Sequence, residues 1–200
     1  MCKWTYPFVA VHRMTLEVIG MSDEYCRALC ELADGVHGAV SLWVAGDVRS
    51  LGGLVNRIGA CAVSLSDRLL HAFCPSLPRT EALLLVESLH TCVLTVQLVA
   101  LTLPPCSVHD PMGASLRRLS THLRQEIATL PRQLRGKRDA QPSPRSRAEV
   151  REETMRLRTR LCLRARQVGS SPEEARAYDA LLTALSDAEA RYLTLALECS

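Results

Sequence analysis

The chain has 200 residues, a net charge of +3, 48% hydrophobic residues and only 4% aromatic ones. This length suits one ordinary domain with a sizeable core. The good helix formers Leu, Ala and Arg are abundant, whereas a β-sandwich or barrel of this size would carry more Val, Ile, Tyr and Phe. The composition therefore predicts an all-α protein and argues against an all-β one.

The charge is unevenly distributed along the chain. Residues 132–168 hold 12 Lys/Arg against 4 Asp/Glu, while the rest of the chain holds 12 basic and 17 acidic residues. A basic segment on a mildly acidic body can meet nucleic acid, an anionic surface or an acidic partner. More often such a segment is simply a solvated helix face and linker.

The nine cysteines are an odd number, and they form no CxxC pair. Cys26 and Cys30 are one helical turn apart, but no second pair of Cys or His follows at the spacing of a zinc site. We therefore expect most of the cysteines to be small buried hydrophobic residues of a protein in a reducing compartment, and we expect no metal or other cofactor. The first 14 residues lack the sustained apolar run of a secretory signal, so the expected location is cytoplasmic and/or nuclear.

The first predicted helix follows an N-terminal extension, residues 1–21, that we expect to be partly disordered. Ser22 precedes two acidic residues and so resembles a helix cap. The helix should run from there to about Val44, loosened by Gly35 and Gly38.

A second helix is expected from about Ser50 to Phe73, after a break at Gly46-Asp47. Its apolar residues recur at three- and four-residue steps, the spacing of one buried helical face. They are Leu54, Ile58, Cys61, Leu65, Leu69 and Ala72.

The third helix carries the most apolar stretch of the chain, ALLLVESLHTCVLTVQLVALTLPP, residues 82–105. Thr80 is its predicted cap, and two prolines end it. A membrane span needs roughly 20 apolar residues, so the stretch is long enough to be one. However, Glu87, His90 and Gln97 interrupt it, and no Trp or Tyr flanks it. We therefore predict the central helix of a bundle with a narrow polar strip, and not a transmembrane segment.

The fourth helix should begin with Asp110 as cap and Pro111 at the first position, and Pro131 should end it. Its predicted buried face consists of Leu116, Leu119, Leu123, Ile127 and Leu130. A flexible basic linker, RQLRGKRDAQPSPRSR, is expected at about residues 132–147 because nothing in it can be buried. Ser143, followed by Pro144, is a candidate site for a proline-directed kinase.

The last part of the chain is expected to form a split helical element. A basic helix should run from Arg147 to Gln167, and Gly169 should end it. Ser171-Pro172-Glu173-Glu174 then combines a cap, a Pro at the first helical position and an acidic first turn. The predicted buried residues of this last helix are Tyr178, Leu181, Leu182, Leu185, Ala188, Tyr192 and Leu195. Residues 22–199 should therefore fold as a single antiparallel bundle of five or six helices.

Sequence signatures of catalysis are missing from the chain. It contains no phosphate-binding loop, no HExxH motif and no nucleophile elbow. Helical bundles can build di-metal sites from repeated ExxH motifs, but Glu87 and His90 form a single copy. We therefore expect a non-enzyme without catalytic, cofactor-binding or metal-binding residues.

The basic segment offers one candidate contact surface for anions or nucleic acid, formed by Arg156, Arg158, Arg160 and Arg164. No aromatic residue occurs between 132 and 168 to stack on a base, which weakens the case for single-strand binding. The helix break near Gly169 also rules out a basic-region leucine zipper.

Three stretches resemble a known family. They are AVSLSDRLLHAFCPSLPRTEALLLVESLHTCVLTVQLVALTLPP (62–105), SLRRLSTHL (115–123) and RLCLRARQVGSSPEEARAYDALLTALSDAEARYLTLALEC (160–199). In order and pattern, over about residues 23–199, they look like the N-terminal domain of the cyclin-D-binding protein (GCIP) family. The chain departs from the family in its basic 132–168 segment and in stopping where members continue through an acidic region into a second helical domain.

The resemblance implies a vinculin/talin-like helical bundle with a non-enzymatic role in the cell cycle or transcription. The implied partners are D-type cyclins or helix-loop-helix proteins. We expect a protein-interaction module that binds other proteins through a helical face or groove. The alternative is an adaptor that binds nucleic acid or anionic membrane through residues 132–168.

Overall fold

The computed structural model describes residues 7–71, 77–103, 111–134, 144–165 and 171–199, with side chains described from Asp23 onward and further gaps within 144–165. None of these residues lies in a strand. The helices are α1 (Pro7–Ala45), α2 (Val48–His71), α3 (Arg79–Thr102), α4 (Pro111–Ile127), the single turn α5 (Leu130–Leu134), α6 (Pro144–Ala165) and α7 (Pro172–Glu198). The predicted all-α fold is confirmed.

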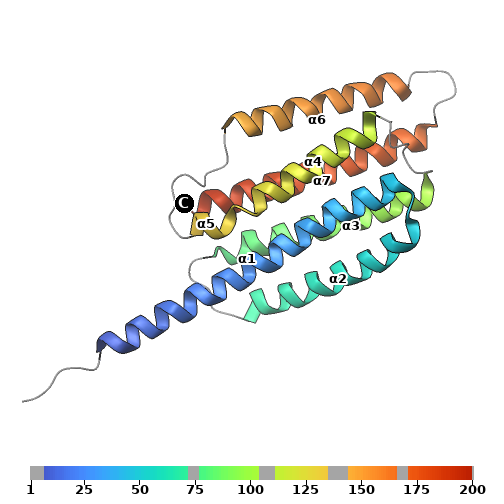
Figure 1. The fold of residues 1–200 in the computed structure, drawn as a ribbon. Coiled ribbons are helices and arrows are strands. Elements are labelled where there is room, and N and C mark those ends of the chain that lie inside the picture. The colour runs from blue at the N-terminus through green and yellow to red at the C-terminus, as the bar shows by residue number, and fades with distance from the viewer. Residues whose placement is uncertain (1–6, 72–76, 104–110, 135–143, 166–170, 200) are drawn as a thin grey trace, which may run out of the picture.

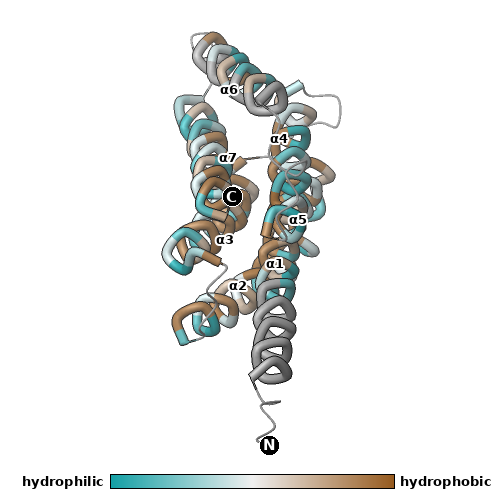
Figure 2. Tube along the Cα trace, turned by 90° about the vertical axis from the view of Figure 1, so that its left-hand side faces the viewer, coloured by the Kyte–Doolittle hydropathy of each residue, from teal (hydrophilic) through white to brown (hydrophobic). Residues whose placement is uncertain are grey.

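The long helices alternate in direction along the chain (Figure 1). Four of them form the centre of the bundle: α1 packs against α3 and α4, and α7 packs against the same two helices. Helix α2 covers α1 and α3 on one side, and α6 covers α4 and α7 on the opposite side (Figure 2). The protein is therefore an antiparallel bundle with a four-helix centre and two outer helices.

Helix α3 is central, as its sequence predicts, because it contacts α1, α2 and α7. Its predicted apolar side is buried and includes Leu85, Leu89, Val93 and Val96. Among the described helices it is the one long and apolar enough to cross a membrane, with 50% of its most apolar 18-residue window buried in the bundle. The core helix of a soluble protein can have the same length and hydrophobicity.

A close approach of α1 and α2 occurs at Gly35. A Cβ atom at this position would lie 2.3 Å from Cδ1 and 2.5 Å from Cγ1 of Ile58. Both distances are shorter than any ordinary van der Waals contact, so only glycine lets the two helices pack this closely. The missing side chain at Gly35 is what admits Ile58, a packing role that the sequence does not indicate.

The break between α1 and α2 lies where the sequence predicts it. Gly46 has a φ of 78°, which is favourable only for glycine, and its N–H donates to the carbonyl of Trp43 at 2.9 Å. The Asp47 carboxylate then accepts a hydrogen bond from the Ser50 N–H at 3.0 Å and so caps α2.

The start of α7 and its buried face are confirmed. The Ser171 hydroxyl accepts a hydrogen bond from the Glu173 N–H at 3.2 Å, and Pro172 occupies the first turn. All seven residues predicted to be buried on this helix are buried, as are the five predicted for the fourth helix. Pro111 begins α4 as predicted, although its predicted cap, Asp110, lies outside the described residues.

Three predicted boundaries are wrong. Helix α1 begins at Pro7, where a proline is favourable, so Ser22 lies inside the helix and does not cap it. Thr80 does not cap α3, because the helix begins at Arg79 after Pro78. Pro131 does not end the fourth helix but lies in the first turn of α5, where a missing N–H costs no hydrogen bond.

The predicted basic linker at about 132–147 is shorter than expected. Residues 132–134 belong to α5 and residues 144–147 to α6. Between them, residues 135–143, including the candidate phosphosite Ser143, lie outside the described residues.

Candidate functional site

Helix α6 carries the basic residues predicted to contact anions. Arg156 and Arg160 are exposed on its outer face, four residues apart, together with Met155. These residues line an open depression of about 620 Å³ on the described part of the helix. The Arg156 Nη2 atom lies 2.6 Å from Oε1 of Glu152, so part of the positive charge is already paired. The side chains of Arg158 and Arg164 lie outside the described residues.

The inner face of α6 is attached to α4 partly by polar contacts. The hydroxyl of Ser115, which is fully buried, donates to Oε1 of Glu153 at 2.6 Å. Nη2 of Arg118 lies 3.9 Å from the same carboxylate oxygen. Leu157 adds a fully buried apolar contact. The basic outer face of α6 is therefore presented by a helix docked through both polar and apolar groups.

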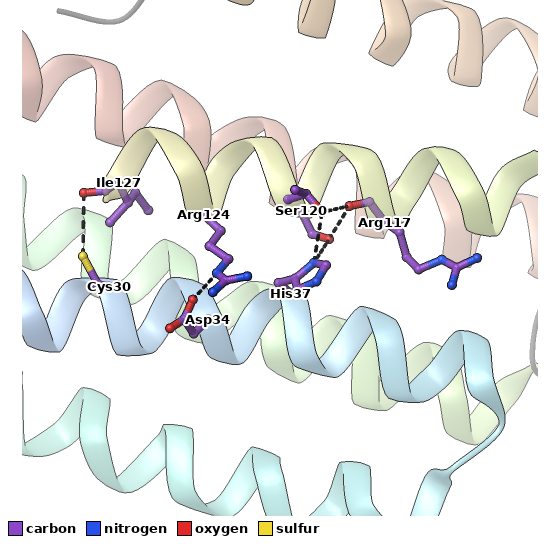
Figure 3. Close-up of polar contacts among 8 residues, drawn as sticks. Cys30, Asp34, His37, Arg117, Ser120, Arg124 and Ile127 are labelled. Atoms are coloured by element: carbon purple, nitrogen blue, oxygen red, sulfur yellow. Dashed lines mark hydrogen bonds and ion pairs between the residues drawn. The ribbon is translucent and has the colours of Figure 1, made fainter. Parts of the chain in front are cut away.

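A polar cluster joins α1 to α4 (Figure 3). Nδ1 of His37 lies 3.1 Å from the Ser120 hydroxyl and 3.4 Å from the Thr121 hydroxyl. Both hydroxyls donate to the carbonyl oxygen of Arg117, at 3.0 and 2.8 Å. In both His37 contacts the donor is set by the tautomer of the imidazole ring.

The position of Ser120 does not suit nucleophilic catalysis. Its side chain is fully buried, so a substrate has no access to its oxygen. The cluster therefore holds two helices together.

The charges around His37 agree with that structural role. Burial lowers the pKa of His37 below 6.5, and Arg124 and Arg117 lower it further, while Asp34 opposes them. Arg124 forms an ion pair with Asp34 across the same helix interface (Figure 3). The neutral imidazole is thus favoured at pH 7.

Glu87 and His90, the single ExxH spacing of the sequence, point in different directions. Glu87 is exposed and lines a pocket between α3 and α7. His90 faces α2, where its Nε2 would lie 3.4 Å from a Cβ atom at Gly59. Within the described residues, no group of three or more His, Cys, Asp and Glu side chains is placed to hold a metal ion.

The pocket beside Glu87 has a volume of about 180 Å³ and is lined from α3 and α7. The Ser88 hydroxyl donates to Oδ2 of Asp187 at 2.8 Å. The other carboxylate oxygen, Oδ1, lies 3.9 Å from Nε of Arg191, a long contact for an ion pair. The pocket therefore contains two carboxylates and one guanidinium group, with hydroxyls of Ser88 and Thr91 on its wall.

An exposed apolar row continues from this pocket along α3. Leu94, Leu98 and Leu101 are 45%, 61% and 70% exposed, although they belong to the most apolar helix of the chain. Sequence reasoning missed this row because it assigned the uncovered side of α3 to polar residues. The available signal was the position of these leucines on the same helical face as Glu87 and Thr91.

The described cysteines fit a role as small hydrophobic residues. Cys26 and Cys92 are fully buried, and burial raises the pKa of the Cys92 thiol to about 12, with a further contribution from Asp187. Burial also raises the pKa of Cys30 and of Cys61. The thiols of Cys30, Cys61 and Cys92 are therefore protonated at pH 7 and are poor nucleophiles.

Comparison with known proteins gives the fold but no family. No protein-family model matches the chain, and no curated protein matches it significantly. A PhoU-like phosphate regulatory protein from Shewanella oneidensis MR-1 is similar in structure, with 11% identity, a TM-score of 0.57 and coverage of 89% of this chain and 98% of that one. A second PhoU-like protein from the same organism has 14% identity, a TM-score of 0.53 and coverage of 90% and 96%. At these identities the chain shares a helical-bundle fold with PhoU-like proteins.

Proposed function

We propose that this chain is a non-catalytic protein-interaction module that binds a helix of a partner protein. The observation that carries the proposal is the exposed row of Leu94, Leu98 and Leu101 on the most apolar helix of the chain. Apolar side chains at i, i+4 and i+7 form one edge of a helix and are the usual anchors of helix-in-groove recognition. Leaving three leucines in water is unfavourable unless a partner covers them.

A regulatory role is supported over a catalytic one by two further observations. The hydroxyl of Ser120, which lies 3.1 Å from His37, is fully buried and so is closed to a substrate. One of the similar solved structures belongs to a PhoU-like phosphate regulatory protein, which makes this fold compatible with regulation. The similarity to the PhoU-like protein is a similarity of fold alone.

The resemblance to the cyclin-D-binding protein family supplies the candidate partners. We propose D-type cyclins or helix-loop-helix transcription factors, and hence a role in the cell cycle or transcription. The protein would act as a scaffold in the cytoplasm and/or nucleus and would not span a membrane. Both partner classes are rich in helices and offer a helix for the exposed face of α3.

Calorimetric titration of the chain with a purified D-type cyclin, and separately with a helix-loop-helix dimer, tests this proposal. Binding of either partner that Leu98→Glu weakens would support it. Binding that Leu98→Glu leaves unchanged would point to another surface. If neither protein binds at concentrations up to about 100 μM, a level that detects interactions of only ~5–6 kcal/mol, the proposed partners are wrong.

The alternative function is an adaptor that binds nucleic acid or anionic membrane through residues 132–168. The observation that favours it is the common exposed face of Arg156 and Arg160. Phosphate contacts make binding fall steeply with salt, so the alternative predicts a steep salt slope. It also predicts that replacing Arg156, Arg158, Arg160 and Arg164 by Ala abolishes binding to duplex DNA or to anionic vesicles. No binding at low salt would contradict it.

A further inference from the structure

The exposed face of α3 has the spacing of a helix–helix seam. Its members follow one another at steps of four, three, four and three residues, and we call them the α3 seam: Glu87, Thr91, Leu94, Leu98 and Leu101. This 3.5-residue period is the one that keeps a row of side chains facing a second helix along its whole length. The spacing therefore favours a helix over an extended peptide as the occupant.

The α3 seam lies between two neighbouring helices. On one side His90 faces Gly59 of α2, and on the other Ser88 donates to Asp187 of α7. Both neighbours contact α3 along the bundle. An added helix would therefore pack on α3 with α2 and α7 as its flanks.

The two ends of the α3 seam differ in chemistry. The Leu94–Leu101 end is apolar, whereas the Glu87 end opens into the pocket of about 180 Å³ that also contains Asp187. Oδ1 of Asp187 is 3.9 Å from Arg191 and so retains the capacity to accept a hydrogen bond. Two carboxylates against one guanidinium group leave this end with an excess of negative charge.

We propose that the α3 seam binds an amphipathic partner helix whose Lys or Arg side chain enters the pocket between Glu87 and Asp187. This inference rests on the proposed function and names the chemistry of its partner. Glu87 precedes Leu94 by seven residues, so the cationic residue lies two helical turns from the nearest apolar anchor of the partner. The three apolar anchors of the partner cover Leu94, Leu98 and Leu101.

Charge complementarity favours such a partner over a second copy of this chain or a lipid surface. The α3 seam contains a carboxylate but no cation, so two seams packed on each other would leave Glu87 without an opposite charge from the other seam. A lipid surface would require Glu87 to leave water for an apolar phase, which is costly. A cationic helix satisfies both ends of the α3 seam at once.

The test is a selection from a library of displayed helical peptides against the full chain, with all positions facing the target randomised. We expect enriched peptides to carry apolar residues at i, i+4 and i+7 and a Lys or Arg two turns away. The best peptide is then titrated by fluorescence anisotropy. Leu98→Glu should weaken its binding at least tenfold, and Glu87→Lys about tenfold.

A charge exchange provides the specific control. Changing the cationic residue of the peptide to Glu should weaken binding to the wild-type chain and restore binding to the Glu87→Lys variant. Met155→Glu, which changes an equally exposed apolar residue of α6 on the opposite side of the bundle, should leave the affinity within twofold. Circular dichroism and the unfolding midpoint confirm that each variant is folded.

The outcomes separate this inference from the proposed function. If peptides are enriched but neither Leu98→Glu nor Glu87→Lys weakens their binding, the chain binds helices through another face and the inference is wrong. If no helical peptide is enriched, both the inference and the proposed function are wrong. Dimerisation of the chain, or vesicle binding that Leu98→Glu abolishes without any peptide binding, would also overturn it.

Discussion

The two outer helices of the bundle, α2 and α6, occupy corresponding positions but are held in different ways. Helix α2 buries six apolar residues against α1 and α3, and Gly35 lets it approach α1 closely. Among the described side chains of α6, Leu157 is the buried one, and the Ser115–Glu153 hydrogen bond supplements it. The described contacts of α2 are therefore mainly apolar, whereas those of α6 include a buried polar contact to α4.

The largest expected difference between the two outer helices comes from truncating one fully buried leucine in each. Leu65→Ala in α2 should lower the free energy of unfolding by about 3 kcal/mol, because it leaves a cavity in the shared core. Leu157→Ala in α6 should instead release that helix locally. Chemical denaturation measures the first effect. Trypsin cleavage at the α6 arginines measures the second and should accelerate only in Leu157→Ala.

The opposite result would remove the distinction between the helices. If Leu157→Ala shifted the global unfolding midpoint as far as Leu65→Ala, without faster cleavage in α6, then α6 would belong to the same cooperative unit as α2.

Adding a methyl group at Gly35 tests how closely α2 packs against α1. Gly35→Ala should destabilise the protein by about 1–2 kcal/mol, because the overpacking against Ile58 exceeds the gain in helix propensity. The matched control is Gly53→Ala, whose new methyl group meets nothing within 4 Å. It should stabilise the protein by about 0.5–1 kcal/mol. Thermal unfolding of both variants checks the opposite signs.

Removing the hydroxyl of Ser115 tests the polar attachment of α6. Ser115→Ala should cost about 1 kcal/mol, because Glu153 loses a buried hydrogen bond but keeps partial access to water. Glu152→Gln removes an exposed ion pair from the outer face of the same helix and should change stability by less than about 0.5 kcal/mol. Equal effects of the two changes would show that the Ser115 contact does not hold α6.

The smallest expected effect is a pH dependence at the α4–α6–α7 junction. Burial lowers the pKa of His122 below 6.5, although Glu126 and Glu149 oppose this, and Glu189 lines the same small cavity. Because the folded state favours the neutral imidazole, the free energy of unfolding should fall as the pH drops below about 6.5, the value expected for the unfolded chain. His122→Asn should reduce this loss.

The control for that change is His71→Asn, which removes an exposed imidazole from α2. Denaturation midpoints of both variants and the wild type between pH 7 and 5 provide the measurement. A wild-type profile that His122→Asn leaves unchanged would contradict the prediction.

Most of the helices and their buried faces were predictable from local signals. Ser171-Pro172-Glu173-Glu174 marks the start of α7, and the 3.6-residue spacing selects its buried residues correctly. Prediction failed where a local signal has two meanings. Ser22 can cap a helix or lie within one. Nothing local indicates that Gly35 admits the side chain of Ile58.

The candidate site was less predictable than the fold. Periodicity shows which residues share a face of α3, but it does not show which face the other helices leave uncovered. Leu94 and Leu98 therefore look like core residues in the sequence and are exposed in the structure. In the same way, nothing local indicates that Asp187 lies next to Ser88.

The sequence by itself determined that this protein is a helical bundle and which side chains α4 and α7 bury, because both depend on local helix signals and on the spacing of apolar residues. Only the tertiary structure decided that α3 keeps an exposed seam, that Asp187 joins Glu87 in one pocket and that Glu153 ties α6 to α4. Those contacts join residues 38 to 100 positions apart, and their geometry depends on how whole helices pack.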